Sequence, residues 1–288
     1  MEETNQELVA NFIEPQPPET PTPNNPPWNS WSAFGVWVVS VISIIVFPLI
    51  FVLPYFLTQS VNLTDAAKST EFLQTDSTAI FLQLLSVIPA HILTLVLAWF
   101  VVTKFNTFSF RETLGWQWNG FRVWHTFVLF IFFYAIALGL TLIFGDVENE
   151  FEKMLNSSRT AVYLVAFFAT FTAPLVEEVI YRGLLYSAFQ RKYGIPIAVF
   201  LVTLLFTAVH IPQYSSSNTP DYAPILTLLI VSLTLTLIRV RTGNLLPCIV
   251  LHTVFNGIQS IFLILQPFLP ENIGGTPEQP AAIIIFFT

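Results

Sequence analysis

Long runs of hydrophobic residues, separated by short polar stretches, are the dominant pattern along this chain. A helix of about 20 apolar residues spans the hydrocarbon core of a bilayer, and most of the runs reach that length. The apolar/polar alternation expected of membrane β-barrel strands is absent. The pattern therefore predicts an all-α polytopic membrane protein, with about seven transmembrane helices at 33–57, 78–103, 123–145, 160–190, 195–211, 222–240 and 244–269.

Two segments bear on the helix count. The fourth segment is longer than one span and contains Pro174, so it is either one kinked helix or two helices. An eighth helix would have to come from Ala281–Thr288, which is apolar but too short to cross a bilayer by itself. We expect seven helices, with eight as the alternative.

The polar ends of the chain define its organisation. Residues 1–32 hold seven prolines and almost no apolar run, which predicts a disordered, acidic, Pro-rich N-terminal tail. The first residues are acidic where a signal peptide needs cations, so we expect no signal peptide. Residues 33–270 then form one helical transmembrane domain, followed by a short C-terminal tail at 271–288.

Composition and charge agree with a membrane protein. The chain is 54% hydrophobic and only 10% charged, whereas soluble proteins carry about 25% charged residues. Its net charge is −7 and it has no basic cluster, so we expect a lipid bilayer as partner and no nucleic acid. Cys248 is the only cysteine, so an intrachain disulfide is impossible.

The distribution of Lys and Arg predicts the orientation, because cytoplasmic loops carry an excess of these residues. With the N-terminus inside a cytoplasmic-type membrane, the outside loops carry Lys68, Lys153 and Arg159. An odd number of spans would then place the C-terminus outside. The inside loops carry the larger group, which consists of Lys104, Arg111, Arg122, Arg191, Lys192, Arg239 and Arg241.

Three charges interrupt the fourth apolar segment, namely Glu177, Glu178 and Arg182. A charge at the centre of a membrane helix costs roughly 3 kcal/mol on insertion scales, so such groups are kept where they are paired or functional. Residues four apart share a helix face, and Glu178 and Arg182 are therefore expected to form an ion pair. Glu177, about 100° around the helix, is left to face another element.

Two further polar clusters lie in later segments. Phe206 and His210 are four apart in the fifth segment, and His252 and Asn256 are four apart in the seventh. If the fourth and fifth segments form an antiparallel hairpin, Glu177 and His210 lie at similar depth, each roughly 22–26 Å from the turn. Facing helices pack 8–10 Å apart, so the two side chains can approach each other or share a water.

These residue types suit peptide hydrolysis. A carboxylate and an imidazole can deprotonate a water, and a second imidazole and an amide can stabilise an oxyanion. A zinc site formed by Glu177, Glu178, His210 and His252 is the alternative within the enzyme class, since Zn²⁺ binds these side chains. No His-Glu-x-x-His motif is present, and water activation with no required metal is favoured. His91, after Pro89, and His125, next to Trp124 at the start of the third segment, each stand alone, and we interpret both as structural or interfacial residues.

The order Glu-Glu-x-x-x-Arg, Phe-x-x-x-His and His-x-x-x-Asn on successive membrane segments resembles the type II CAAX prenyl endopeptidases, also called Abi or CPBP intramembrane proteases. The resemblance covers about 160–260. It implies Glu177 and His210 as the water-activating pair and His252 and Asn256 as oxyanion residues. Glu178 and Arg182, and with them Phe206, would then be supporting residues. The family has been described both as metalloproteases and as glutamate-dependent hydrolases, and its core usually has eight spans.

The sequence thus predicts an intramembrane endopeptidase that cleaves near the C-terminus of a membrane-tethered peptide or prenylated protein. A non-catalytic immunity or scaffold protein of the same fold is one alternative. A proton-coupled transporter is another, although transporters commonly show inverted repeats and this chain shows none.

Overall fold

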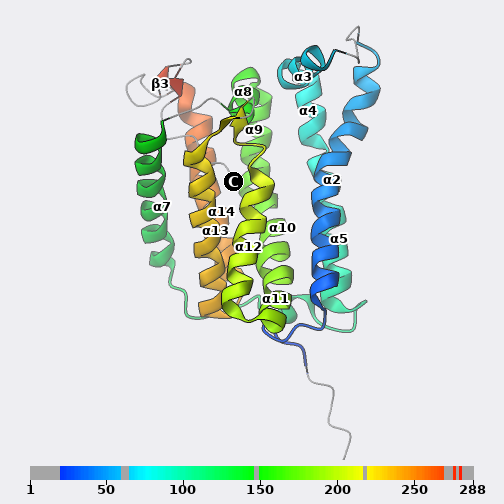
Figure 1. Ribbon diagram of the computed structural model, residues 1–288, viewed down its shortest axis with the longest axis vertical. Coiled ribbons are helices and arrows are strands. Elements are labelled where there is room, and N and C mark those ends of the chain that lie inside the picture. The colour runs from blue at the N-terminus through cyan, green and yellow to red at the C-terminus, as the bar shows by residue number, and fades with distance from the viewer. Residues whose placement is uncertain are drawn as a thin grey trace, which may run out of the picture.

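The computed structural model describes residues 20–59, 65–145, 149–216 and 219–268, and the backbone of 275–276 and 279–280. Its long helices stand side by side in one bundle (Figure 1). The α-helices of the described residues are α2 (Ser30–Phe56), α3 (Ala66–Thr75), α4 (Ser77–Leu85), α5 (Val87–Thr103), α6 (Phe110–Leu114), α7 (Val123–Phe144), α8 (Glu150–Ser157), α9 (Arg159–Phe167), α10 (Ala173–Glu178), α11 (Tyr186–Tyr193), α12 (Ile195–His210), α13 (Tyr222–Thr242) and α14 (Leu246–Leu265).

Shorter elements complete the described chain. Two π-helical segments, η1 (Phe168–Thr172) and η2 (Val179–Leu185), flank α10, and a 3₁₀ turn η3 (Gln266–Phe268) ends α14. Two-residue strands pair as β1 (Ser215–Ser216) with β2 (Thr219–Pro220), and β3 (Gly275–Thr276) with β4 (Gln279–Pro280).

The prediction of an all-α polytopic membrane protein is confirmed. Within the described ranges, six helical stretches are long and apolar enough to cross a membrane, and α12, at 16 residues, is a shorter apolar helix beside them. Each of the seven predicted segments corresponds to one of these helices. The predicted source of an eighth helix, Ala281–Thr288, lies outside the described residues.

The fourth segment is one continuous helical stretch, Arg159–Tyr193, of 35 residues. Pro174 lies inside this stretch, in the first turn of α10 directly after η1, and its missing N–H removes one backbone hydrogen bond from the helix. The stretch contains two π-helical segments, η1 just before that proline and η2 around Arg182. π-Helical turns inside α-helices are frequent at functional sites, because they shift the direction of the following side chains.

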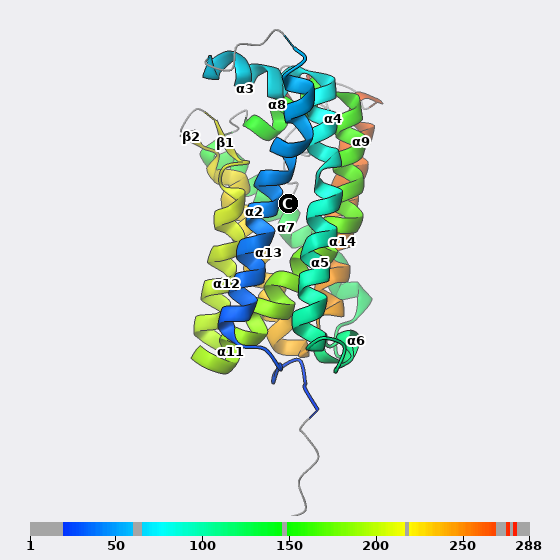
Figure 2. The same cartoon turned by 90° about the vertical axis from the view of Figure 1, so that its right-hand side faces the viewer.

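The contacts between helices place the stretch Arg159–Tyr193 at the centre of the bundle. α2 packs on α5, α12 on α13, and α13 on both α7 and α14, while α14 also packs on α9, η1 and α10. Figure 1 shows α7 at one edge of the bundle and α2 with α5 at the other. Figure 2 shows α3 and α8 together at one end of the molecule and α6 and α11 at the opposite end.

Polar caps and glycines set several of the helix ends. The side chains of Asn29, Asp65 and Asp76 accept hydrogen bonds from backbone N–H groups in the first turns of α2, α3 and α4. Gly243 ends α13 with φ +68°, a left-handed conformation that glycine adopts without strain. These signals keep each helix end close to the boundary suggested by hydrophobicity.

The C-terminal part of the predicted N-terminal tail is ordered against the bundle. Residues 1–19 lie outside the described residues, but α2 begins at Ser30 and the indole of Trp28 is buried, with Nε1 donating to Leu184 O (3.1 Å). Arg191 donates to the carbonyl oxygens of Pro26 and Trp28 (2.7 Å for the latter). The predicted disorder therefore does not extend to residue 32, because Arg191 and the burial of Trp28 hold this segment against the bundle.

Arg239 supplies the second attachment of that segment. It is fully buried at the end of α13, where its guanidinium donates to Pro23 O (2.9 Å), Asn24 Oδ1 (3.4 Å) and Ser187 Oγ (3.1 Å). Arg239 is therefore more than a marker of the helix end. It joins the ordered tail to α11 and α13.

Trp28→Ala tests the attachment of the tail. Truncating a buried aromatic side chain typically costs about 3–5 kcal/mol, so the variant should unfold at a lower temperature in detergent and be cut sooner by protease before residue 30. Trp31→Ala is the matched control, because Trp31 is 76% exposed. Equal effects of the two substitutions would contradict a specific role for Trp28.

Candidate active site

Arg182 lies at the centre of a buried polar network. Its side chain is fully buried in η2 and makes hydrogen bonds with all three of its nitrogens. Nη1 donates to Glu178 Oε1 (2.9 Å), Nη2 to the backbone and side-chain oxygens of Ser232 (2.9 Å each), and Nε to Thr236 Oγ1 (3.3 Å). The ring of Phe206 packs against the guanidinium at 4.9 Å. The predicted ion pair of Glu178 and Arg182 is present.

Glu178 joins this pair to α14. The same Oε1 atom accepts a hydrogen bond from Nδ1 of His252 at 2.8 Å, and both side chains are fully buried. Because a carboxylate oxygen only accepts, His252 carries a proton on Nδ1 and presents Nε2 to the opposite side. One carboxylate oxygen thus holds two donors from different helices and fixes the orientation of the imidazole.

Glu177 lies on the far side of His252. Its Oε2 atom is 3.8 Å from His252 Nε2. The side chain of Glu177 is 19% exposed, whereas those of His252 and Glu178 are fully buried. Oε2 itself is buried and accepts no hydrogen bond from the part of the chain that the structure describes. Glu177 therefore carries an unsatisfied carboxylate oxygen beside an oriented imidazole, as expected of a group that binds a water or substrate.

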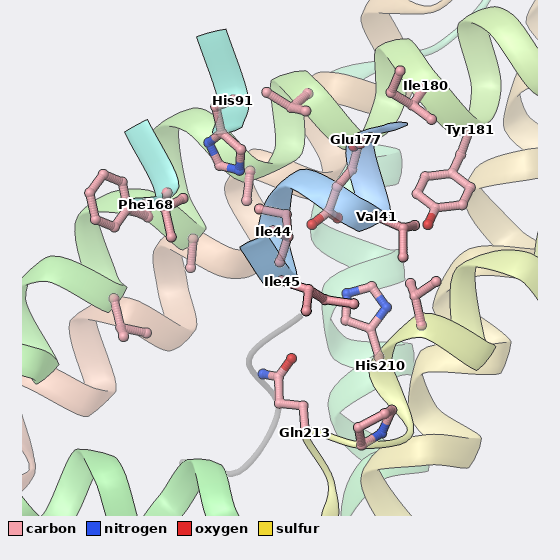
Figure 3. A pocket seen from close by; sticks show the side chains of 18 of the residues that line it. Val41, Ile44, Ile45, His91, Phe168, Glu177, Ile180, Tyr181, His210 and Gln213 are labelled. Atoms are coloured by element: carbon pink, nitrogen blue, oxygen red, sulfur yellow. The ribbon is translucent and has the colours of Figure 1, made fainter. Parts of the chain in front are cut away.

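Glu177 and His210 line the same cavity, of about 550 Å³, as the hairpin geometry predicts. Figure 3 shows the two side chains reaching toward the same space from α10 and α12. Nδ1 of His210 donates to Phe206 O at 2.7 Å, so the neutral imidazole presents Nε2 as an acceptor. A carboxylate and an imidazole acceptor facing one cavity can together take a proton from a bound water.

Most of the cavity wall is apolar. It includes residues of α2, α4 and α5 on one side and of the fourth stretch and α12 on the other. Ile44 and Ile45 of α2 belong to this wall and are exposed, so the cavity is open to the surroundings on that side. Gln213, from the connection after α12, adds a polar group. An apolar wall with a few polar groups is typical of a site that binds an apolar ligand.

His252 and Asn256 lie behind this cavity and do not form part of its wall. Asn256 is fully buried, and its Nδ2 donates to the backbone oxygen of Ala169 in η1 at 2.9 Å. This hydrogen bond links the amide of Asn256 to the π-helical segment η1. The structure brings all seven predicted site residues into one cluster, with Glu177 and His210 on its accessible side.

The structure adds His91 to the cavity wall. Its Nδ1 lies 3.0 Å from Thr172 Oγ1, and its side chain is partly buried opposite Glu177 (Figure 3). Sequence reasoning interpreted His91 as structural or interfacial because it stands alone, outside the polar motifs. Its neighbours come from a helix 81 residues later, so no local pattern could have found it. His125, in contrast, accepts a hydrogen bond from Arg122 N in the first turn of α7 and remains a capping residue.

The four side chains considered for a zinc site lie in this cluster but are not arranged as a set of metal ligands. Among the described residues, no group of three or more His, Cys, Asp or Glu side chains is arranged to hold a metal ion. Glu178 Oε1 is occupied by Arg182 and His252 Nδ1, which turns that carboxylate away from the cavity. The donor set as arranged does not fit a four-ligand zinc centre.

Comparison with known families places this cluster in a known domain. Residues 159–258 match the family model described as type II CAAX prenyl endopeptidase Rce1-like. This segment is an Rce1-like domain. It covers roughly a third of the chain and contains every predicted site residue. No curated protein and no solved structure is recognisably similar to the chain.

The family match agrees with the helical architecture. The Rce1-like domain begins at the start of α9 and ends within α14, so it includes the central stretch and the three helices packed around it. With six apolar helices long enough to span, the chain is an integral multi-pass membrane protein. The match of 159–258 supports peptidase activity of the CAAX type at the level of the family.

Arg182→Leu tests the network. Removing one partner of a buried ion pair typically costs about 3–5 kcal/mol, because the other charge stays buried without compensation. We expect a large fall in unfolding temperature in detergent. Arg241→Leu, at the exposed end of α13, is the control and should change it little. A stable Arg182→Leu protein would show that the network contributes little to folding.

Proposed function

We propose that this protein is an intramembrane endopeptidase that hydrolyses a peptide bond near the C-terminus of a membrane-tethered or prenylated substrate. The observation that carries the proposal is the convergence of Glu177 and His210 on one cavity with mostly apolar walls. They come from different helices of the Rce1-like domain, and a cavity of this kind suits a peptide with a lipid or apolar side chains.

The chemistry follows from the atoms that face the cavity. Glu177, together with Nε2 of His210, binds a water and takes one proton from it. The water oxygen then attacks the carbonyl carbon of the substrate. The carbonyl π electrons move to oxygen and form an oxyanion. When the tetrahedral intermediate collapses, the C–N bond breaks and the proton passes to the leaving nitrogen.

The remaining residues hold and assist this pair. The network of Arg182 and Glu178 fixes the imidazole of His252, which in turn lies beside Glu177. A carbonyl oxygen bound next to Glu177 would lie close to His252, and we keep His252 and Asn256 as the predicted oxyanion residues. Phe206 contacts both the buried network and the water-activating pair, since its ring packs on Arg182 and its carbonyl oxygen orients His210.

Glu177→Gln tests the water-activating role. The amide keeps the shape of the side chain but cannot accept a proton, so the variant should lose cleavage by at least about 100-fold, in the range of general-base effects. Purified wild-type and variant proteins would be incubated in detergent with a fluorescence-quenched, prenylated C-terminal peptide and with the same peptide lacking the lipid.

Glu71→Gln, an exposed change on α3, is the control and should cleave like wild type. Full activity of Glu177→Gln would exclude Glu177 as the base. Absence of cleavage by wild type of either peptide would contradict the peptidase assignment for this substrate class and favour a binding-only protein of the same fold.

We propose that no metal is required, because the favoured mechanism uses only Glu177 and His210 as proton acceptors. A zinc chelator should therefore leave the rate of peptide cleavage unchanged after prolonged incubation. Loss of cleavage with chelator, restored by added Zn²⁺ but not by Mg²⁺, would support the metallopeptidase alternative.

We also propose that the N-terminus faces the cytoplasm in a cytoplasmic-type membrane. Lys and Arg gather at the end of the bundle where α6 and α11 lie, whereas the end with α3 and α8 carries only Lys68, Lys153 and Arg159 among the described residues (Figure 2). The single, buried Cys248 makes the test direct.

In a Cys248→Ala background, Lys68→Cys should react with a membrane-impermeant maleimide in intact cells, and Arg111→Cys should react only after lysis. The reverse pattern would show the opposite orientation.

A further inference from the structure

Tyr181 occupies a position on the cavity wall that the predicted mechanism does not use. It follows Glu177 by four residues, so both side chains lie on one face of the central helical stretch, and both line the cavity. Figure 3 shows the Tyr181 hydroxyl on the side of its ring that faces the cavity with Glu177 and His210.

The hydrogen bonding of this hydroxyl leaves its proton available. Nε1 of Trp37, on α2, donates to the Tyr181 oxygen at 3.1 Å. An indole N–H is a donor only, so the tyrosine oxygen is the acceptor and its own hydrogen must point elsewhere. Within the described chain, that hydrogen meets no other acceptor at hydrogen-bond distance.

The ring is held firmly in place. Tyr181 is only 5% exposed and packs edge-on against Phe206, with ring centroids 5.0 Å apart and planes at 75°. Phe206 also packs on Arg182. The position of Tyr181 therefore depends on the same buried network that orients the imidazole of His252. A donor fixed before the reaction stabilises developing charge without a cost of reorganisation.

We propose that Tyr181 is a further catalytic residue, whose hydroxyl donates a hydrogen bond from the cavity wall to the oxyanion of the tetrahedral intermediate. This inference rests on the proposed peptidase function. The hydroxyl keeps its proton throughout: the electron pair that moves to the carbonyl oxygen accepts the hydrogen bond and returns when the C–N bond breaks. His252 and Asn256 lie behind Glu177, whereas Tyr181 supplies a donor that lines the cavity itself.

Tyr181→Phe is the variant that tests the proposal, because it removes the hydroxyl and keeps the ring against Phe206. Loss of one oxyanion donor typically lowers kcat by about 100- to 1,000-fold. We expect a fall of at least about 100-fold in kcat for the quenched peptide, with KM within about twofold of wild type. A peptide phosphinate of the same sequence, whose tetrahedral anionic group resembles the intermediate, should lose affinity by a similar factor.

Tyr186→Phe is the matched control. Tyr186 is as deeply buried on the next turns of the same stretch, but its hydroxyl donates to Gln190 Oε1 (3.2 Å) and it is not part of the cavity wall. This variant should keep wild-type kcat and phosphinate affinity. Unfolding temperatures of both variants, measured in the same detergent, show whether a loss of rate reflects a loss of folded protein.

The outcomes separate the two proposals. If wild type cleaves and Glu177→Gln does not, then unchanged kcat in a folded Tyr181→Phe protein overturns the assignment of Tyr181 and leaves the peptidase function in place. A higher KM with unchanged kcat also overturns it, because the hydroxyl would then bind the substrate equally in the ground state and in the transition state. Absence of cleavage by wild type overturns both.

Discussion

The buried ion pair of Arg182 and Glu178 is the interaction on which the rest of the site depends. A guanidinium inside a membrane protein is stable only when its donors are satisfied, and here the acceptors come from the same stretch and from α13. The carboxylate then holds His252 of α14. Three helices are therefore held in register by charge, where apolar packing against lipid would provide little specificity.

The division of labour between the two adjacent glutamates follows from helix geometry. Consecutive residues point about 100° apart, so Glu178 faces α13 and α14 while Glu177 faces the cavity. The same rule places Tyr181 with Glu177, and Arg182 with Glu178, since each pair is four residues apart. One side of the stretch thus forms the buried ion pair, and the other side lines the cavity.

The backbone of the central stretch is irregular on both sides of Glu177. η1 precedes it and η2 follows it, and each contributes to the site, the first through Ala169 O and the second through Tyr181 and Arg182. Departures from α-helical geometry leave carbonyl oxygens to be satisfied by side chains, and Asn256 satisfies one of them. The irregular backbone and the polar residues of α14 therefore depend on each other.

The helical segments and the polar cluster follow from local rules that operate along the sequence. Bilayer thickness dictates the length of each apolar run, and intramembrane charge is costly enough to make Glu177, Glu178 and Arg182 visible against their background. The depth shared by Glu177 and His210 could be calculated from the rise of a helix. Tyr181 could have been found in the same way, from its spacing of four from Glu177.

Other features depend on residues that meet only when the chain is folded. Three hydrogen-bonded pairs are examples: Trp37 and Tyr181 are 144 residues apart, His91 and Thr172 are 81 apart, and Trp28 and Leu184 are 156 apart. No periodicity connects such positions, because their contact depends on how whole helices pack. The sequence by itself determined the membrane helices, the ion pair and a set of candidate site residues. Only the tertiary structure decided which of them face the cavity, because that depends on which neighbouring helix satisfies each buried polar group.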